Sequence, residues 1–371
     1  MSNPKSTYDI PKLPPESNFE SVEIYKALST ATRSLAELKG LAKSIPNQGI
    51  LIDSLTLQEA RASSAIENIV TTQDDLFRVD MSMERTASGP TKEVALYRDA
   101  MRLGWENLKA NQKIISNRSL IAQFQLLKGI DTGFRNTGGT ILQSSNNEVV
   151  YVPPQIPDNI ERHMSDLERF INDPDLCELD PLIKMAIIHH QFESIHPFPD
   201  GNGRIGRILN VLYLVVSGLL DIPVLYLSRY INKNKNEYYR YLQNVRDATT
   251  EEARSDAWQV WVIYMLKAVD DTSRTTINLV EGIRDQMAVM KSEIRDGELN
   301  KLYSQDLINN LFRHPYTRNE FIERDLSITR KTATKYLDQL TEAGILHKVR
   351  EGRNNYYMNH RLINLLASVS D

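Results

Sequence analysis

The chain has 371 residues, and its 44 lysines and arginines against 48 aspartates and glutamates give a formal net charge of −4. That balance argues against a globally cationic nucleic-acid binder, although it leaves a local basic patch open. The length and a hydrophobic content of 41% predict two or three domains with substantial cores. A single cysteine excludes an intramolecular disulfide framework, and no apolar run has the length of a membrane span. We therefore expect a cytoplasmic protein that binds no membrane.

The first part of the chain is expected to be helical. Residues 1–17 are polar and contain four prolines, so they predict an extended N-terminal arm. We assign residues 18–110 to an N-terminal helical region. Apolar residues recur at the helical period in four stretches, which are 19–44, 51–66, 92–109 and 118–128.

Between residues 133 and 154 the pattern changes from helix to strand. Two glycines precede T-I-L-Q, a polar S-S-N-N turn follows, and E-V-V-Y-V then leads into two prolines. Short β-favouring runs around a polar turn are typical of a hairpin. The second strand carries Val149, Val150 and Tyr151. We therefore predict a small β-hairpin inside a mainly helical core domain that spans 111–270.

Residues 189–210 read HHQFESIHPFPDGNGRIGRILN and combine a titratable base, an acidic side chain, a glycine-flanked turn and two arginines. His196 precedes a proline, and such residues are biased away from the α region, so the preceding helix should end there. A second helix should begin just after Gly201, Asn202 and Gly203. Glycine and asparagine both tolerate positive φ, so that backbone N–H groups can converge on an anion at the helix N-terminus. The stretch predicts a phosphate-binding site.

The side chains around this turn suit phosphate chemistry. Asp200 can offer hard oxygen to Mg²⁺, which prefers carboxylates, waters and substrate phosphates. Arg204 and Arg207 are three residues apart on the new helix and can fork onto phosphate oxygens. The imidazole of His196 titrates near neutrality, which suits a general base that takes a proton from a hydroxyl.

A zinc site is the competing interpretation of the same region. His190, Glu193 and His196 fall loosely on one helical side, as metal ligands would. The order H-E-x-x-H is absent, however, and a proline follows His196 directly. We expect no zinc there, and we expect His189 and His190 either to pack in the core or to support the site residues from behind.

The rest of the chain continues as helices and ends in a compact unit. Residues 271–299 are expected to form a linking helix, and residues 300–371 a separate domain with three helices and a two-stranded wing. That domain resembles winged helix-turn-helix domains, with T-R-K-T-A-T-K-Y-L-D-Q-L as the recognition helix. Its 11 basic and 8 acidic residues from 301 to 371 give only +3, so contact with DNA and contact with protein both stay open. The other expected helices are 156–172, 180–195, 204–217, 256–268 and 272–294.

The segment H-P-F-P-D-G-N-G-R-I-G-R, residues 196–207, resembles without a gap the signature of Fic (filamentation induced by cAMP) domain proteins. The resemblance implies a mainly α fold, a Fic-type helical bundle with a small β-hairpin called the flap. It also implies a protein adenylyltransferase, which moves AMP from ATP to a Tyr, Thr or Ser hydroxyl and releases pyrophosphate. His196 would be the base and Asp200 the Mg²⁺ ligand. The ATP-binding residues would be Gly201, Asn202, Gly203, Arg204, Ile205, Gly206 and Arg207.

Further residues take roles from the same resemblance. The helix end S-S-A-I-E-N places Ser63, Glu67 and Asn68 in the pattern of the inhibitory motif of many Fic proteins. A carboxylate paired with Arg207 would occupy the clamp that the γ-phosphate of ATP needs. In the family the flap holds the target by strand addition, a role that would fall here on Val149, Val150 and Tyr151. The candidates for holding adenine and ribose are Tyr230, Asn232 and Tyr239.

Two alternatives stay open. The chain could be a DNA-binding transcriptional regulator whose Fic domain senses a nucleotide. It could also move another phosphate-linked group, or remove AMP, as some members of the resembling family do. A homodimer is expected by analogy with the family.

Overall fold

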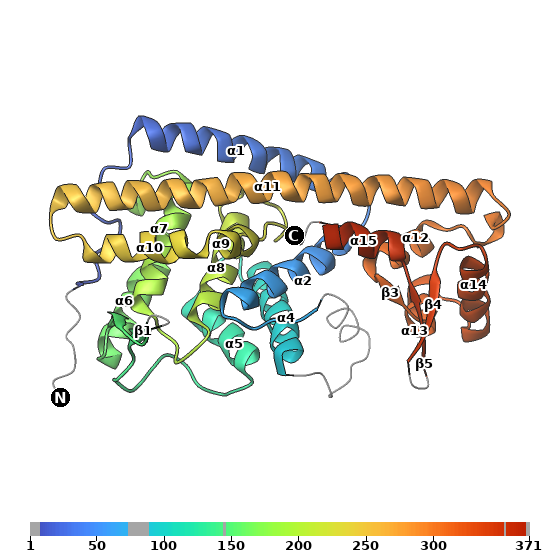
Figure 1. The fold of residues 1–371 in the computed structure, drawn as a ribbon, viewed down its shortest axis with the longest axis horizontal. Helices are drawn as coiled ribbons and strands as arrows, with labels where there is room; N and C mark the ends of the chain where they lie inside the picture. Colours follow the sequence, from blue (N-terminus) through green and yellow to red (C-terminus); the bar gives the residue numbers. More distant parts are fainter. Residues whose placement is uncertain (1–7, 73–88, 144–145, 352–353, 369–371) are drawn as a thin grey trace.

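A computed structural model describes residues 8–72, 89–143, 146–351 and 354–368. Within these ranges the protein is mainly helical, as the sequence predicts, with one two-stranded and one three-stranded sheet (Figure 1). No helix of the described ranges is both long and apolar enough to cross a membrane. The first seven residues of the expected N-terminal arm lie outside the described residues.

The N-terminal helices follow the predicted stretches closely. They are α1 (Val22–Ala42), α2 (Gln48–Ile66), α4 (Gly89–Ala110) and α5 (Asn117–Lys128). Three of them have a side-chain N-cap, because a side-chain oxygen of Ser21, Asn47 or Ser116 accepts a hydrogen bond from a backbone N–H of the first turn. The described part of the arm lies on the core, where the carbonyl oxygen of Pro11 accepts the side-chain amide of Gln191 at 2.9 Å.

The core domain places two buried helices at its centre. Both α7 and α8 are apolar on nearly all sides, as expected of helices that other elements surround. The loop between them holds the predicted phosphate site. The helices of this region are α6 (Pro157–Asn172), α7 (Pro181–Ile195), α8 (Asn202–Val216), α9 (Ser228–Lys233) and α10 (Lys235–Asp247), with a 3₁₀ turn at Pro174–Leu176.

One continuous helix replaces the two that the sequence predicts over 256–268 and 272–294. Helix α11 (Glu251–Asp296) has 46 residues and runs through the expected boundary between 270 and 271. No glycine or proline interrupts that boundary, and the hydroxyl of the buried Thr272 is satisfied within the helix by the carbonyl of Ala268. At about 1.5 Å per residue the helix is roughly 70 Å long, and α1 lies along it (Figure 1).

The C-terminal unit contains the predicted three helices and hairpin, and it adds strand β3 and helix α15, which the sequence does not predict. The three strands pair antiparallel in the order β3-β5-β4. The unit contacts α2, because Arg313 lies 2.9 Å from the carboxylate of Asp53 and Gln58 donates to the carbonyl of Leu366. Its elements are a 3₁₀ turn at Asn300–Leu302, α12 (Gln305–Arg313), β3 (Tyr316–Thr317), α13 (Asn319–Leu326), α14 (Arg330–Glu342), β4 (His347–Glu351), β5 (Asn354–Met358) and α15 (His360–Ser368).

Candidate active site

His196 closes helix α7 in an unusual backbone conformation. Its φ of 49° and ψ of 59° lie in the left-handed region, which few residues other than glycine and asparagine adopt readily. The backbone N–H of His196 still bonds to the carbonyl of Phe192, so the residue caps the helix. The chain then turns sharply at Pro197. This geometry holds the imidazole at the junction between the helix and the phosphate loop, where the sequence places it.

Arg135 braces this junction, and the sequence analysis does not find it. Its guanidinium donates to the carbonyl oxygens of His196 at 2.7 Å and Pro154 at 2.9 Å, and its backbone N–H donates to Pro197 at 2.7 Å. The residue is only 4% exposed. One buried cation therefore ties the end of the hairpin segment to the loop that carries His196. No spacing or motif in the sequence marks an arginine that acts through backbone carbonyls.

The surroundings of His196 keep its ring neutral. Burial, and then the charges of Arg135 and Arg246, lower the pKa of His196 to about 3. At neutral pH the imidazole therefore has an unprotonated nitrogen. A neutral imidazole can accept a proton, as a general base must.

The stretch that the sequence predicts to bind an anion forms the N-terminus of α8. Gly201 is its N-cap with φ 74°, a left-handed conformation that favours glycine. The first N–H groups of a helix have no partner within the helix, and here they belong to Asn202, Gly203 and Arg204. The side chain of Asn202 does not face an anion but clamps the loop, because it both accepts from and donates to the backbone of Phe198, at 2.8 and 2.7 Å.

Asp200 faces solvent beside this helix N-terminus. Its carboxylate accepts the N–H of Gly201 at 2.7 Å and the ammonium of Lys128 at 2.6 Å. Partial burial raises the pKa of Asp200, but the hydrogen bond and charge of Lys128 outweigh burial and bring the pKa below its usual value. The side chain is thus an exposed carboxylate, which suits Mg²⁺ as one ligand among waters and phosphates. The described ranges contain no group of three acidic, histidine or cysteine side chains that could hold a metal alone.

Arg207 is occupied by the motif at the end of α2. Its guanidinium donates to the hydroxyl of Ser63 at 2.7 Å, to the carbonyl of Ser63 at 3.0 Å and to the carboxylate of Glu67 at 3.0 Å. Burial alone would lower the pKa of Arg207, yet the charge of Glu67 contributes to a net rise above the usual value. The pair between Glu67 and Arg207 that the sequence analysis expects is therefore present.

Helix α2 ends in a way that fixes the position of Glu67. Asn68 has φ 62°, and its N–H bonds to the carbonyl of Ala65, while the N–H of Ile69 bonds back to Ser64. This is a left-handed C-terminal cap, which glycine and asparagine adopt with the least strain. Glu67 is consequently the C-cap residue, directly after the last helical residue Ile66, and its side chain extends beyond the helix end toward α8.

Arg204 has different partners from those of Arg207. It is 1% exposed and lies 2.7 Å from the second carboxylate oxygen of Glu67 and 2.8 Å from Glu93 of α4. Glu67 therefore bridges both arginines of the signature. The two residues between them face inward, since Ile205 is fully buried and a Cβ on Gly206 would lie 3.1 Å from the carboxylate of Glu193. Their side-chain positions serve packing against α7.

The three candidates for adenine and ribose do not come together. Tyr239 is 47% exposed; partial burial raises its pKa, and the nearby charge of Arg207 opposes that rise, so it lies near the clamp. Tyr230 packs on Tyr264 with ring centroids 5.4 Å apart. Asn232 lines a separate cavity beside α2. Of the three, the structure brings only Tyr239 to the phosphate site.

The hairpin strands are β1 (Leu142–Gln143) and β2 (Val149–Tyr151), which pair antiparallel. Val149 and Val150 are 45% and 44% exposed. Tyr151 instead points inward, where its hydroxyl donates to the carbonyl of Ser194 at 2.8 Å and the guanidinium of Arg246 lies 4.0 Å above its ring. Tyr151 thus anchors the hairpin, and the two valines form its exposed face.

The histidines that precede the site belong to the core, as expected. His189 and His190 are fully buried, and their rings pack on Trp261 and Trp258. Burial lowers the pKa of His189 to about 3. Glu193 is also buried, and burial raises its pKa to about 7.

Comparison with protein families identifies three consecutive matches. The model of the Fic/DOC family N-terminal region matches residues 25–106, that of the Fic/DOC family matches 117–214, and that of the SoFic-like protein adenylyltransferase C-terminal domain matches 287–362. A probable protein adenylyltransferase of Aquifex aeolicus is 28% identical over 184 residues, which are 49% of this chain and 54% of that protein. The protein adenylyltransferase fic-1 of Caenorhabditis elegans is 35% identical over 91 residues, 24% of this chain and 16% of that protein.

Solved structures share the fold. A Fic family protein from Desulfovibrio desulfuricans aligns with a TM-score of 0.57 at 21% identity, and the alignment covers 91% of this chain and 96% of that protein. Fic-1 of Caenorhabditis elegans has a TM-score of 0.51 at 19% identity and covers 69% and 72%. The chain spans about half, or less, of the length of the curated relatives it matches. The three family matches, together with the intact signature at 196–207, show that the chain is a Fic domain protein.

Proposed function

We propose that this Fic domain protein is a protein adenylyltransferase that transfers AMP from ATP to a Tyr, Thr or Ser hydroxyl of a target protein or of itself. The observation that carries the proposal is a neutral His196 beside a glycine-capped helix N-terminus whose Arg207 is held by a carboxylate. The names of the relatives, which are protein adenylyltransferases, support the same reaction.

In this reaction His196 takes the proton of the target hydroxyl, and the hydroxyl oxygen attacks the α-phosphorus of ATP. The bond from the α-phosphorus to the bridging oxygen breaks, and pyrophosphate leaves. The N–H groups at the start of α8 and, once Glu67 releases it, the guanidinium of Arg207 would bind the charge of the leaving group. Asp200 would hold Mg²⁺, which would neutralise phosphate charge. Lys128 would have to give up its contact with Asp200 for that purpose.

We further propose that Glu67 restrains the reaction from within the chain. Its carboxylate occupies the guanidinium of Arg207 that the γ-phosphate would need. ATP bound without that clamp would be misaligned, and a displacement of about 1 Å can reduce a rate about 100-fold.

The exposed valines of β2 would receive the target segment as an added strand.

Intact mass spectrometry after incubation with ATP and Mg²⁺ tests the proposal. An AMP-sized addition to Glu67→Gly, weak in the wild type and absent in Glu67→Gly/His196→Ala, is expected. If none of the variants gains AMP, either alone or with a cell extract as a source of targets, the assignment of the reaction is wrong. Salt-dependent binding of duplex DNA in that case would favour the regulator instead.

A further inference from the structure

The guanidinium of Arg207 is held mainly by the body of helix α2 and only in part by Glu67. Its Nε donates to the hydroxyl of Ser63 at 2.7 Å, and its Nη2 donates to the carbonyl of Ser63 and to the carboxylate of Glu67, both at 3.0 Å. Two of these three contacts would remain if Glu67 turned away. Glu67 can do so without a movement of α2, since it is the C-cap residue and its side chain is 23% exposed.

The remaining nitrogen of Arg207 lies over the start of α8. A Cβ on Gly203 would be only 2.8 Å from Nη1, so a glycine is needed there to leave room for the guanidinium. Among the described residues none accepts a hydrogen bond from Nη1, whereas Nε and Nη2 both have acceptors. The contacts with Ser63 therefore hold one edge of the guanidinium and direct its other nitrogen toward the helix N-terminus, where an anion is expected to bind.

One helical turn before Ser63, a buried carboxylate fixes α2 to its neighbours. Glu59 is 2% exposed. It accepts hydrogen bonds from the backbone N–H of Ser228 at 3.2 Å, from the hydroxyl of Ser228, and from the hydroxyl of Tyr97 at 3.0 Å. Ser228 begins α9 and Tyr97 belongs to α4, so one side chain ties α2 to two helices. Residues four apart share a helix face, so Glu59 fixes the face that carries Ser63.

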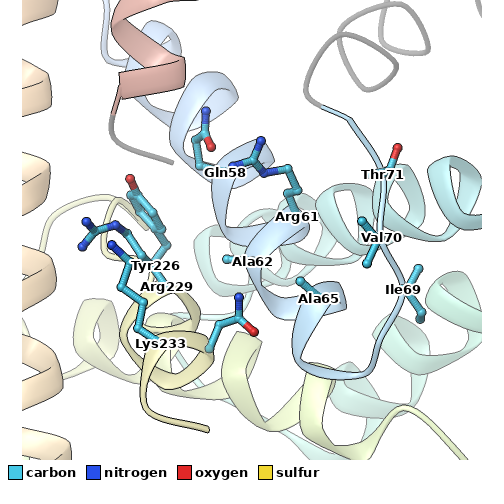
Figure 2. A pocket seen from close by; sticks show the side chains of 11 residues that line it. Gln58, Arg61, Ala62, Ala65, Ile69, Val70, Thr71, Tyr226, Arg229 and Lys233 are labelled. Atoms are coloured by element: carbon cyan, nitrogen blue, oxygen red, sulfur yellow. The ribbon is translucent and has the colours of Figure 1, made fainter. Parts of the chain in front are cut away.

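The opposite face of α2 does not contribute to these contacts. Figure 2 shows that face, where Gln58, Arg61, Ala62 and Ala65 line a cavity of about 200 Å³ that α2 shares with α9. At 100° per residue these positions point away from Glu59 and Ser63. A cavity supplies few packing contacts, which leaves more of the positioning of α2 to the hydrogen bonds of Glu59.

We propose that Glu59 is a positioning residue that acts through Ser63, so that Arg207 stays directed at the γ-phosphate of ATP after Glu67 has released it. This role rests on the proposed function, which makes the γ-phosphate the ligand of Arg207. Helix α2 then has two opposite effects on the same arginine. Its body holds the guanidinium in place for ATP, and its C-cap residue occupies the guanidinium until it is released.

Calorimetry with ATP and with AMP, each with Mg²⁺, tests the role in Glu67→Gly/His196→Ala, a parent in which Arg207 is free and no transfer occurs. Adding Glu59→Gln should weaken ATP binding about tenfold, because the amide turns an NH2 donor toward the donors around it. AMP lacks the γ-phosphate, so its affinity should change less than about twofold. Equal losses for ATP and AMP would indicate a general structural effect and overturn the proposal.

The matched control is Glu168→Gln. That carboxylate also accepts a backbone N–H, from Asn117 at 2.7 Å, but it lies at the start of α5 and makes no described contact with α2. Its replacement in the same parent should change neither affinity.

Ser63→Ala tests the route from Glu59 to Arg207. In the same parent it should weaken ATP binding about tenfold, whereas a serine that serves only the restraint would leave the affinity unchanged or raise it. With alanine already at position 63, adding Glu59→Gln should cost less than about a further threefold, because both changes act on one contact. A full further tenfold loss would show that Glu59 does not act through Ser63.

NMR of Arg207 tests the positioning without any nucleotide. The Nε–H of a buried, hydrogen-bonded arginine exchanges slowly with water, and its signal is identified by its loss in Arg207→Lys. The exchange should be at least about tenfold faster in Glu59→Gln and also in Tyr97→Phe, which removes a single donor and keeps the shape of the core. Unchanged exchange in both variants overturns the proposal. If no variant binds ATP while the exchange responds as expected, the proposed function fails and the positioning of Arg207 stands.

Discussion

Replacing Glu67 with glutamine should release the restraint only in part, because glutamine keeps the shape of glutamate and loses its charge. The carboxylate contacts Arg207 at 3.0 Å and Arg204 at 2.7 Å, and both arginines are at most 2% exposed. Glutamine has one acceptor oxygen, so it can keep a hydrogen bond to one arginine but turns an NH2 donor toward the other. A hydrogen bond to a charged group contributes about 1.5–3 kcal/mol, so we expect the pairing with the two arginines to weaken by about 2 kcal/mol.

At about 1.4 kcal/mol per factor of ten, this difference corresponds to an increase of roughly 30-fold in the population whose Arg207 is free to bind ATP. The initial rate of self-modification, followed by intact mass spectrometry at saturating ATP and Mg²⁺, should rise by a similar factor. Glu67→Gly removes the carboxylate entirely and should be faster still. The expected order is wild type, Glu67→Gln, Glu67→Gly.

The matched control is Glu93→Gln, which neutralises the other carboxylate on Arg204 but does not touch Arg207. Its rate should stay within a few-fold of the wild type, since the amide oxygen of glutamine can still accept the hydrogen bond from Arg204. A Glu67→Gln rate equal to that of the wild type would mean that occupancy of the site, and not charge, restrains the protein. Equal acceleration by Glu93→Gln would show that Arg204, and not Arg207, is the controlling clamp.

Three further outcomes follow from the site. His196, whose folded pKa is about 3, should stay neutral in NMR titrations of the folded protein down to about pH 4, while the unfolded chain titrates near pH 6.5. Between these two pKa values the unfolded chain binds a proton at this histidine and the folded protein does not, so the free energy of unfolding should decrease as the pH falls from about 6.5 towards 3. A folded-state titration of His196 near pH 6.5 would contradict this. Arg135→Lys should lower the free energy of unfolding by about 3 kcal/mol in denaturant titrations and slow AMP transfer about 100-fold, because lysine cannot donate to two carbonyls at once. A variant with the stability and the rate of the wild type would rule out the bracing role. Lys128→Ala should lower the Mg²⁺ concentration for half-maximal rate by up to about fivefold, because the exposed ion pair between Lys128 and Asp200 contributes up to about 1 kcal/mol. If the variant instead needs more Mg²⁺ than the wild type, Lys128 binds the nucleotide.

The sequence predicts the parts of the site that depend on neighbours in the chain. His196, the glycine turn and the two arginines lie within one turn and one helix start, so backbone preferences alone bring them together. The contact of Glu67 with Arg207 spans 140 residues, and only the resemblance to a family points to it.

The features that the sequence does not predict arise from tertiary packing. Arg135 acts through backbone carbonyls, which leave no trace in side-chain patterns. Asn232 is adjacent in sequence to the expected nucleotide-binding tyrosines, yet the short helix α9 turns it toward the back of α2. Helix α11 continues through its polar middle, where Thr272, Ser273 and Thr276 are buried by packing, and such packing outweighs local propensity.

The pairing of α1 with α11 has a consequence for how the chain is made. Phe19, just before α1, packs its ring against Trp258 of α11, and the buried stripe of α1 lies along the same helix. These partners are more than 200 residues apart, so α1 cannot bury its apolar face against α11 until more than 200 further residues have been synthesised. A chain that stops before residue 251 should therefore present the face of α1 to chaperones and proteases. Pulse proteolysis of stalled nascent chains, with cleavage in α1 lost only after α11 emerges, would reveal that order.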